Sequence, residues 1–304
     1  IETSFNVGIF WRSGYNLTIN PGDIIHERAI ICICYKWEHE QDVQFLTWDK
    51  KQSDKAMIKA FLKVMAQADE IVAHNGDRFD LKWLRTRAII HGLNVMPSPK
   101  TIDTLKWARK YFNFNSNKLD YIAKYLGVGQ KMDTGGLDLW KDIVFKKDQQ
   151  AMDKMVEYCK MDVTVLEAVF NKLNSYATPS THYAVMEGDE KYCCPECTNY
   201  NVRHNKQVVT AAGTVHYWML CNDCRKHFKI NNKKIEEVVK SVEQIETKTP
   251  TELINKENSN STAAQVVESK PKNVIATNSK ENCSNENEIL IVLLYTWHTY
   301  CLKQ

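Results

Sequence analysis

A short strand, a polar turn and the start of a helix are indicated by the segment Glu70-Ile71-Val72-Ala73-His74-Asn75-Gly76-Asp77-Arg78-Phe79-Asp80. Its first four residues form a short apolar run of the kind found in buried strands, and the polar residues after them lead into a helix-forming segment. In α/β proteins, ligands commonly bind at the sheet edge where such strands end. The stretch therefore predicts an α/β domain with Asp80 at a binding edge.

Strand and helix patterns alternate on both sides of this stretch. Residues 24–37 and 43–48 have β-rich or alternating sequences, which predict two strands. Apolar residues recur at helical spacing elsewhere, most clearly over 148–175, which predicts a long helix with one apolar stripe. Three further helices are predicted over 54–67, 81–91 and 117–125. A strand pair followed by helices that alternate with a further strand indicates a mixed sheet covered by helices.

The composition is that of an ordinary globular protein. The chain has 304 residues, 43% of them hydrophobic, and a net charge of +3, so any surface that attracts nucleic acid must be local. Residues 1–10 have neither the basic start nor the apolar run of a secretory signal, which predicts reduced cysteines and a cytoplasmic location. The apolar run 289–295 is far shorter than the roughly 20 residues that span a membrane, so no membrane partner is expected.

Acidic residues in three distant segments have the chemistry of a divalent-metal site. Glu2 stands near the start, Asp80 follows a predicted strand, and Asp162 lies inside the longest predicted helix. Asp162 borders the apolar stripe of that helix, where a bare carboxylate is costly to bury without a partner or a metal. Tyr158 lies one helical turn before Asp162, on the same face. Taken singly, each residue also fits a structural role, as a solvated acid, a helix cap or a surface hydrogen bond.

The order of these segments resembles the tyrosine-type branch of the DEDD 3′–5′ exonucleases, in the ribonuclease H-like superfamily. The motifs that carry the resemblance are Ile1-Glu2-Thr3, His74-Asn75 with Phe79-Asp80, and Tyr158 with Asp162-Val163. Residues 100–105, 117–122 and 126–128 are also similar to predicted exonucleases of phages and prophages, many of which end in a zinc ribbon. The resemblance covers residues 1–176.

This resemblance implies a two-metal nuclease site. Glu2, Asp80 and Asp162 would bind two Mg²⁺ or Mn²⁺ ions, and Tyr158 would orient or help deprotonate the attacking water. Cleavage would release nucleoside monophosphates from the 3′ end of DNA or RNA. The substrate is therefore expected to be nucleic acid with a free 3′ end.

Other residues near these motifs have less specific roles. His74 and Asn75 are expected at the edge of the site, in contact with the substrate strand, and Asp103 is expected to cap a helix. In the resembled family the first motif is Asp-x-Glu, and its Asp would stand directly before Ile1. Because the downstream motifs are in place, we expect a truncated start and weak metal binding by the chain as given, rather than a decayed site.

Four cysteines form a separate motif. They are arranged as two CxxC pairs, Cys194 with Cys197 and Cys221 with Cys224. Two such pairs supply the four thiolates of a tetrahedral structural Zn²⁺ site. Cys194 is preferred to the adjacent Cys193 because it completes the spacing. Basic and aromatic residues surround the motif, which suits phosphate contact and base stacking, although protein binding stays open as the alternative.

These patterns divide the chain into four segments. They are a ribonuclease H-like exonuclease domain over 1–177, a linker over 178–190, a four-cysteine zinc ribbon over 191–230 and a polar, mostly disordered tail over 231–304. The resemblance implies the cytoplasm of a bacterium or phage-infected cell, with a replication or recombination protein as a further partner. A structure-specific endonuclease of the same fold and a non-catalytic nucleic-acid-binding module are the alternatives. The sequence does not specify the oligomeric state.

Overall fold

The computed structural model describes most of the first 230 residues and one strand near the C-terminus. The described residues are 1–11, 14, 18–38, 40–95, 99–130, 132, 135–186, 188–230 and 289–292. The chain divides into two compact units. The first comprises Ile1–Ala177 with Asn287–Gln304, and the second comprises Thr178–Glu286.

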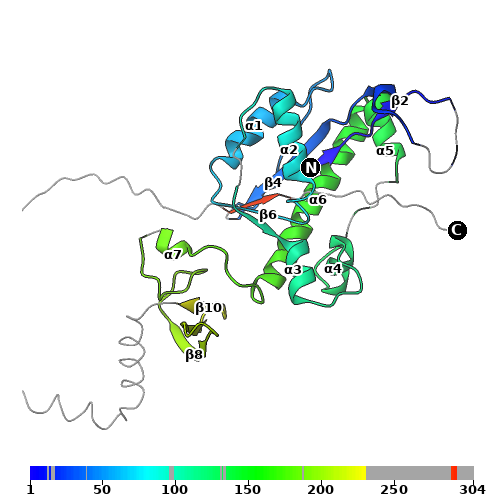
Figure 1. The fold of residues 1–304 in the computed structure, drawn as a ribbon. Coiled ribbons are helices and arrows are strands. Elements are labelled where there is room, and N and C mark those ends of the chain that lie inside the picture. The colour runs from blue at the N-terminus through cyan, green and yellow to red at the C-terminus, as the bar shows by residue number, and fades with distance from the viewer. Residues whose placement is uncertain are drawn as a thin grey trace, which may run out of the picture. The chain divides into compact units, whose positions relative to one another are not determined.

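The first unit is built on a mixed six-stranded sheet (Figure 1). Its strands are β1 (Glu2–Thr3), β4 (Ile30–Trp37), β5 (Gln44–Thr47), β6 (Glu70–Ala73), β7 (Thr101–Asp103) and β11 (Ile289–Val292). β4 pairs antiparallel with β1, β5 and β11, whereas the β11–β6 and β6–β7 pairs are parallel. The predicted mixed α/β sheet is therefore confirmed.

β1 and β11 share one edge of β4 and follow one another along it. β5 occupies the other edge, where it pairs with Cys32–Tyr35. β1 lies opposite Ile30 and Cys32, and β11 lies opposite Tyr35–Trp37, with both running antiparallel to β4. The red arrow in Figure 1 is β11. This strand falls within the tail that the sequence predicts as mostly disordered; the rest of residues 231–304 lies outside the described residues.

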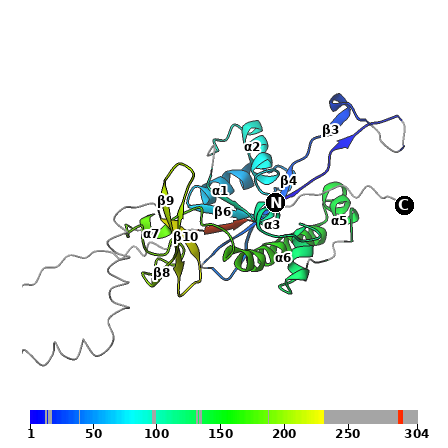
Figure 2. The same cartoon turned by 60° about the horizontal axis from the view of Figure 1, so that its bottom comes forward.

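Helices cover both faces of the sheet (Figures 1 and 2). α1 (Lys55–Met65) and α2 (Asp80–Ile90) pack on one face, where the ring centres of Tyr35 and Phe61 are 5.6 Å apart. α6 (Gln149–Asn174) packs on the other face, where the Cys34 thiol lies 3.8 Å from the Val156 carbonyl oxygen. The remaining helices are α3 (Thr104–Tyr111), α4 (Leu119–Tyr125), α5 (Asp138–Lys141) and a π-helical turn over Asp142–Lys146.

A buried carboxylate joins β4, α1 and α2. Asp54, directly before α1, is fully buried and accepts hydrogen bonds from the Ile30 amide at 2.9 Å and from the Arg87 guanidinium at 2.7 and 2.8 Å. The His91 Nε2 atom lies 2.6 Å from the same carboxylate. Burial acts to raise the pKa of Asp54, but Arg87, the Ile30 amide and His91 together hold that pKa below its usual value.

A two-stranded ribbon extends from the start of the first unit. It consists of β2 (Val7–Gly8) and β3 (Ile24–His26), with a 3-10 turn over Pro21–Asp23 before β3. The β-rich stretch predicted over 24–37 contains two strands, β3 and β4. Between them, the Arg28 amide donates a hydrogen bond to the Asn6 side chain at 3.0 Å.

The second unit is a small antiparallel sheet with one short helix. Its elements are α7 (Tyr183–Met186), β8 (Val202–Val209), β9 (Val215–Cys221) and β10 (His227–Ile230), with β9 in the middle of the sheet. α7 lies within the predicted linker 178–190. Its Tyr183 is buried and donates its amide hydrogen to the Pro195 carbonyl at 3.0 Å, so this segment is folded onto the cysteine-containing part of the unit.

Candidate nuclease and zinc sites

A tight turn after β6 positions Asp80. Asn75 in this turn has φ of 69°, a left-handed conformation that asparagine adopts more readily than most residues. Its carbonyl oxygen accepts hydrogen bonds from the Arg78 and Phe79 amides, each at 3.2 Å. The turn reverses the chain within a few residues, so α2 begins at Asp80, beside the end of β6.

The Asp80 carboxylate is buried but has unused acceptor capacity. It is 0% exposed, and neither of its oxygen atoms has a hydrogen-bond partner among the described residues. The terminal amino group of Ile1 lies 3.9 Å from one of these oxygens. Burial raises the pKa of Asp80 well above its usual value and Glu2 adds to this, while the Ile1 ammonium opposes it. Such a carboxylate suits a metal ion, which would replace the missing donors.

Asp77, in the same turn, differs from Asp80 in its partners. Its carboxylate accepts a hydrogen bond from the Thr101 hydroxyl at 2.8 Å and forms an ion pair with Lys106. These contacts attach the turn to β7 and α3. In this turn, Asp80 is therefore the acid whose carboxylate oxygens have no hydrogen-bond partner among the described residues.

Strand pairing places the Glu2 side chain on the α6 face of the sheet. Glu2 is only 4% exposed and lies directly opposite Cys32 in the antiparallel β1–β4 pair, so the two side chains point to the same face. A hydrogen bond between the thiols of Cys32 and Cys159, together with burial, raises the pKa of Cys32. Because Cys159 belongs to α6, the Glu2 side chain also faces this helix.

α6 carries the remaining predicted residues of this site. Tyr158 is 5% and Asp162 0% exposed, and Cys159 lies between them in the sequence. Residues three and four apart share a helix face, so Asp162 lies on the same side of α6 as Cys159. The structure thus brings Glu2 and the Cys159–Asp162 side of α6 to one region of the sheet.

The Ile1 amino group links these residues to Asp80. Burial acts to lower the pKa of this amino group, but Cys159, Asp80 and Glu2 raise it to about 10. Groups of β1, α2 and α6 thus all lie near enough to this amino group to affect its pKa. Among the described residues, the four cysteines of the second unit form a group whose ligand atoms all lie within 4.8 Å of one another. The carboxylates of Glu2, Asp80 and Asp162 are less tightly grouped than these cysteines.

His74 has a positioning role in the turn after β6. It is 9% exposed, its Nε2 atom lies 3.0 Å from the Asn117 carbonyl oxygen, and its Nδ1 atom lies 2.9 Å from the Thr104 hydroxyl. These contacts connect β6 with the starts of α3 and α4. Both ring nitrogens are thus engaged within the protein, and contact of His74 or Asn75 with a substrate stays a prediction.

Asp103 caps α3, as the sequence predicts. Its carboxylate accepts a hydrogen bond from the Leu105 amide at 3.0 Å. The same oxygen accepts one from the Asn75 amide at 2.8 Å, so Asp103 also holds the turn that leads to Asp80. Burial raises the pKa of Asp103, while the two amides act to lower it.

Three buried thiols beside the carboxylates were not predicted as a group. Cys32 and Cys34 point from β4 to the α6 face, and their thiols interact with that of Cys159. Two signals in the sequence could have suggested this: Cys32 and Cys34 alternate within one strand, and Cys159 directly follows Tyr158. Because all three are almost fully buried, we assign them to the packing between β4 and α6.

The four predicted zinc ligands converge in the second unit. The Cys194 and Cys224 sulfur atoms are 3.5 Å apart, and those of Cys197 and Cys221 are 3.6 Å apart. Four thiolates around a zinc ion at about 2.3 Å would be separated by roughly 3.8 Å, so these residues fit tetrahedral zinc. Cys193 points elsewhere, with its thiol 2.8 Å from the Glu190 carbonyl oxygen, which confirms the preference for Cys194.

Backbone amides support both halves of this cysteine site. The amides of Cys197 and Glu196 act to lower the pKa of Cys194, although burial raises that pKa overall. The amides of Cys224 and Asp223 act in the same way on Cys221. In each CxxC turn, the second and third residues after the first cysteine thus direct hydrogen bonds at its sulfur, which stabilises a thiolate.

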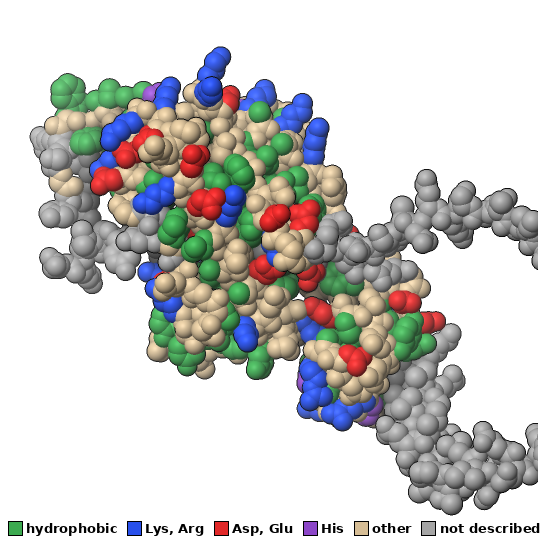
Figure 3. Space-filling view, turned by 180° about the vertical axis from the view of Figure 1, so that it is seen from behind, with side chains coloured by type: hydrophobic (Ala, Val, Ile, Leu, Met, Phe, Trp, Pro, Cys, Tyr) green, Lys and Arg blue, Asp and Glu red, His purple; other side chains and the backbone are tan. Residues whose placement is uncertain are grey.

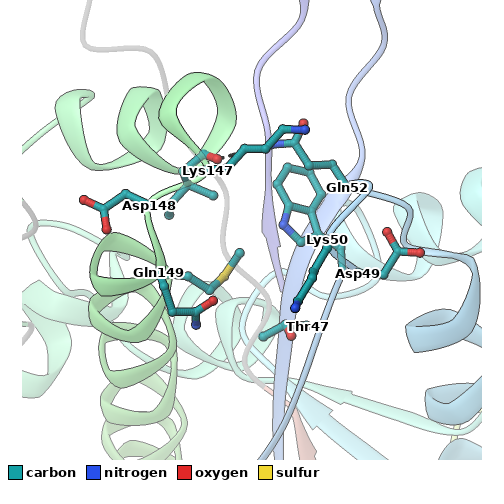
Figure 4. A pocket seen from close by; sticks show the side chains of 10 residues that line it. Thr47, Asp49, Lys50, Gln52, Lys147, Asp148 and Gln149 are labelled. Carbon is teal, nitrogen blue, oxygen red and sulfur yellow. Dashed lines mark hydrogen bonds between the residues drawn. The ribbon is translucent and has the colours of Figure 1, made fainter.

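A further pocket lies away from these residues, between the turn after β5 and the start of α6 (Figure 4). It has a volume of about 350 Å³. Asp49 and Lys50 lie on one side, and Lys147 and Asp148 on the other, so its charges balance. The Gln52 side chain crosses this region and donates hydrogen bonds to the Ile143 and Val144 carbonyls at 3.2 and 2.9 Å.

Comparison with protein families identifies the class of the first unit. A model of the RNase H superfamily matches residues 26–174, so this part of the chain is ribonuclease H-like and has a nuclease-type fold. The match includes Asp80, Tyr158 and Asp162 and begins after Glu2. Members of this superfamily typically depend on divalent metal ions. Comparisons with curated proteins and with solved structures gave no match.

Within the described part of the chain, every helix is too short or too polar to cross a membrane.

Proposed function

We propose that the first unit is a 3′–5′ exonuclease that hydrolyses phosphodiester bonds of DNA or RNA with two Mg²⁺ or Mn²⁺ ions. The observation that supports this most directly is the Asp80 carboxylate, which is fully buried and has no hydrogen-bond partner among the described residues, with Glu2 and Cys159 near enough to affect its pKa. Acids from distant segments that converge at a sheet edge of a ribonuclease H-like domain provide oxygen ligands for hard divalent cations.

Each side chain has a distinct role in this proposal. Glu2, Asp80 and Asp162 would hold the ions, which when bound lower the pKa of water and neutralise charge on the phosphate. Tyr158, one turn before Asp162, would orient the attacking water or help to remove its proton. Asp103 and His74 would act indirectly, since they hold the turn that leads to Asp80.

The position before Ile1 is important for the test. The Ile1 nitrogen lies 3.9 Å from the Asp80 carboxylate, so a residue attached there would be placed beside the proposed metal site. The resembled family has an aspartate at this position. We therefore expect the chain extended by Asp before Ile1 to cleave much faster than the chain extended by Asn, whose side chain has nearly the same shape but no charge.

The decisive assay uses 5′-labelled single-stranded DNA and RNA with Mg²⁺ or Mn²⁺ and the Asp-extended chain. We expect a ladder that shortens from the 3′ end, with the sugar preference read from the two substrates. Asp162→Asn and Asp80→Asn should abolish the ladder, whereas Asp77→Asn, an acid of the same turn with its own partners, should retain it. These variants are better controls than a chelator, which would also remove zinc.

The other outcomes identify the alternatives. Cuts at internal positions of branched DNA, without shortening from the end, would support a structure-specific endonuclease of the same fold. Binding without cleavage on every substrate, with both metals and with the Asp extension, would support a non-catalytic nucleic-acid-binding module. A replication or recombination protein as partner stays part of the proposal and is tested separately by co-purification with the full chain.

A further inference from the structure

The sheet of the second unit has two different faces. β9 is its central strand, and alternate residues of a strand point to opposite sides. Tyr217, Met219 and Cys221 are buried in the core around the cysteine site. Trp218 and Leu220 therefore belong to the other side, which we call the Trp218 face.

Strand pairing places a lysine on each side of Trp218. Trp218 lies opposite Lys206 of β8 and Lys229 of β10, so the three side chains share one face. The Lys229 ammonium is 4.7 Å from the centre of the Trp218 ring. Both lysines are exposed, and Trp218 is partly exposed. The indole ring is thus bordered by positive charge on both neighbouring strands.

The next row of this face is also basic. Leu220 lies opposite Arg203 of β8 and His227 of β10. Arg203 and Lys206 are three residues apart, a separation that normally places strand residues on opposite faces. A bulge in β8 between His204 and Lys206 adds one residue and brings both cations to the Trp218 face.

No carboxylate on these strands balances this charge. β8, β9 and β10 contain neither Asp nor Glu. Figure 3 shows Lys, Arg and His side chains gathered on one part of the second unit, with its Asp and Glu side chains elsewhere. The polar and aromatic members of the Trp218 face are Arg203, Lys206, His216, Trp218, His227 and Lys229.

We infer that the Trp218 face binds single-stranded nucleic acid. Arg203, Lys206 and Lys229 supply three cations on one face for successive phosphates, and this charge favours a polyanion over an ordinary protein surface. Trp218 supplies a ring on which an unpaired base stacks. Bases in a duplex already stack on one another, so a single strand is the better ligand. The inference concerns a surface apart from the carboxylates and holds whether or not they cleave.

Fluorescence anisotropy with labelled single-stranded oligo(dT) and oligo(rU) tests this surface. The full chain is used in an Asp162→Asn background, so that the probes stay intact. We expect Trp218→Ala to weaken binding roughly tenfold and Trp218→Phe, which retains a ring, to weaken it by less than about threefold. Lys206→Gln with Lys229→Gln should weaken binding and reduce the slope of log affinity against log salt by roughly 1.4, about 0.7 for each phosphate contact.

Controls separate binding from folding. Lys191→Gln removes an exposed charge from the same unit outside the three strands and should bind like the parent. Zinc content is measured for every variant. If Trp218→Ala loses zinc, the inference is tested by the double variant Lys206→Gln with Lys229→Gln, whose positions are exposed. Unchanged affinity in zinc-loaded Trp218→Ala and in the lysine pair would overturn the inference. If Trp218→Ala weakened binding of a blunt duplex probe as much as binding of a single strand, stacking of an unpaired base on Trp218 would be ruled out. A difference between oligo(dT) and oligo(rU) would identify the preferred sugar.

Discussion

Two buried aspartates of the first unit differ in how their charge is compensated. Asp54 receives hydrogen bonds from a backbone amide, an arginine and a histidine, and its pKa is lowered. Neither Asp80 oxygen has a hydrogen-bond partner in the part of the chain that the structure describes, and the pKa of Asp80 is raised. Both side chains are fully buried, but hydrogen bonds to Asp54 offset the effect of burial on its pKa, whereas Glu2 adds to that effect at Asp80. The environment of Asp54 suits a carboxylate that stabilises the fold, and that of Asp80 suits a carboxylate that binds a ligand.

Replacing Asp54 should destabilise the first unit strongly. Asp54→Asn leaves the partly buried Arg87 without a charged partner, so we expect a loss of about 3 kcal/mol in the free energy of unfolding. Asp120→Asn is the matched control, because Asp120 pairs with Lys124 at the surface, and it should cost less than about 0.5 kcal/mol. Denaturant unfolding measures both. A cost for Asp54→Asn as small as that of the control would contradict the assigned role.

The same aspartate should contribute to stability in a pH-dependent way. Its folded-state pKa lies below the unfolded value of 3.8, so as the pH falls the unfolded chain takes up this proton first. The stabilisation is therefore complete above about pH 4 and is lost as the pH falls further through the folded-state pKa. Across this range, the free energy of unfolding should therefore change more steeply with pH for the parent than for Asp54→Asn. Parallel curves would show that other acids control acid unfolding.

Asp80 should show a pH dependence of its own, in its affinity for a metal ion. Its raised pKa means that a proton must leave before the carboxylate can bind a cation, so affinity for Mn²⁺ should increase as the pH rises from about 5. Asp80→Asn should reduce the affinity more than roughly tenfold, and Asp77→Asn should change it little. Electron paramagnetic resonance of free Mn²⁺ gives both values. Equal losses in the two variants would point to a general charge effect.

At the scale of elements, the sequence predicts the features that depend on local periodicity. The apolar stripe predicts α6 within two residues at either end, and the apolar run with its polar turn predicts β6 and the start of α2. The Asp103 cap and the selection of Cys194 were also predicted, since each rests on short-range spacing. Convergence of Glu2 with α6 could be inferred only from a family resemblance, because it depends on the pairing of β1 with β4.

Other elements depend on contacts that no local pattern reveals. β7 is three residues long and is defined by its parallel pairing with β6. β11 lies more than two hundred residues from its neighbours β4 and β6, and the polar sequence around it obscured a four-residue strand. The Trp218 face likewise required the register of β8, since the bulge changes which residues point the same way.

The pairing of β11 on both of its edges gives a testable consequence. Ile291 pairs with Lys36 of β4 and with Val72 of β6. Ile291→Pro removes the backbone donor from a strand paired on both sides, so we expect a cost of roughly 3 kcal/mol and a fall in Tm of roughly 6 °C or more. Ile291→Val keeps the donor and should leave Tm nearly unchanged. Equal Tm values for both variants would show that β11 does not support the sheet.

At the scale of the whole molecule, the two units should respond separately to loss of zinc. The second unit has a small core around its four cysteines, so its folding should depend on the metal. Cys221→Ser should remove zinc and abolish the unfolding transition of the second unit, while that of the first unit stays within about 2 °C. Calorimetry with zinc analysis measures this. Cys193→Ser is the control and should keep its zinc, because its thiol points to the Glu190 carbonyl.

Loss of both transitions in Cys221→Ser would mean that the units fold as one cooperative body. Loss of neither, with zinc absent, would mean that hydrophobic packing alone holds the second unit.

The two units follow one another directly in the chain, with Ala177 ending one and Thr178 beginning the other. A strand held by the Trp218 face would therefore remain near the first unit at an effective concentration on the order of millimolar, as for modules joined by a short connection. A nuclease with such an attachment re-engages the same molecule after each cut instead of releasing it. Shortening would then be processive, and cutting the chain at both of its connections between the units, after Ala177 and before Asn287, would make it distributive without altering the chemistry of a single cut.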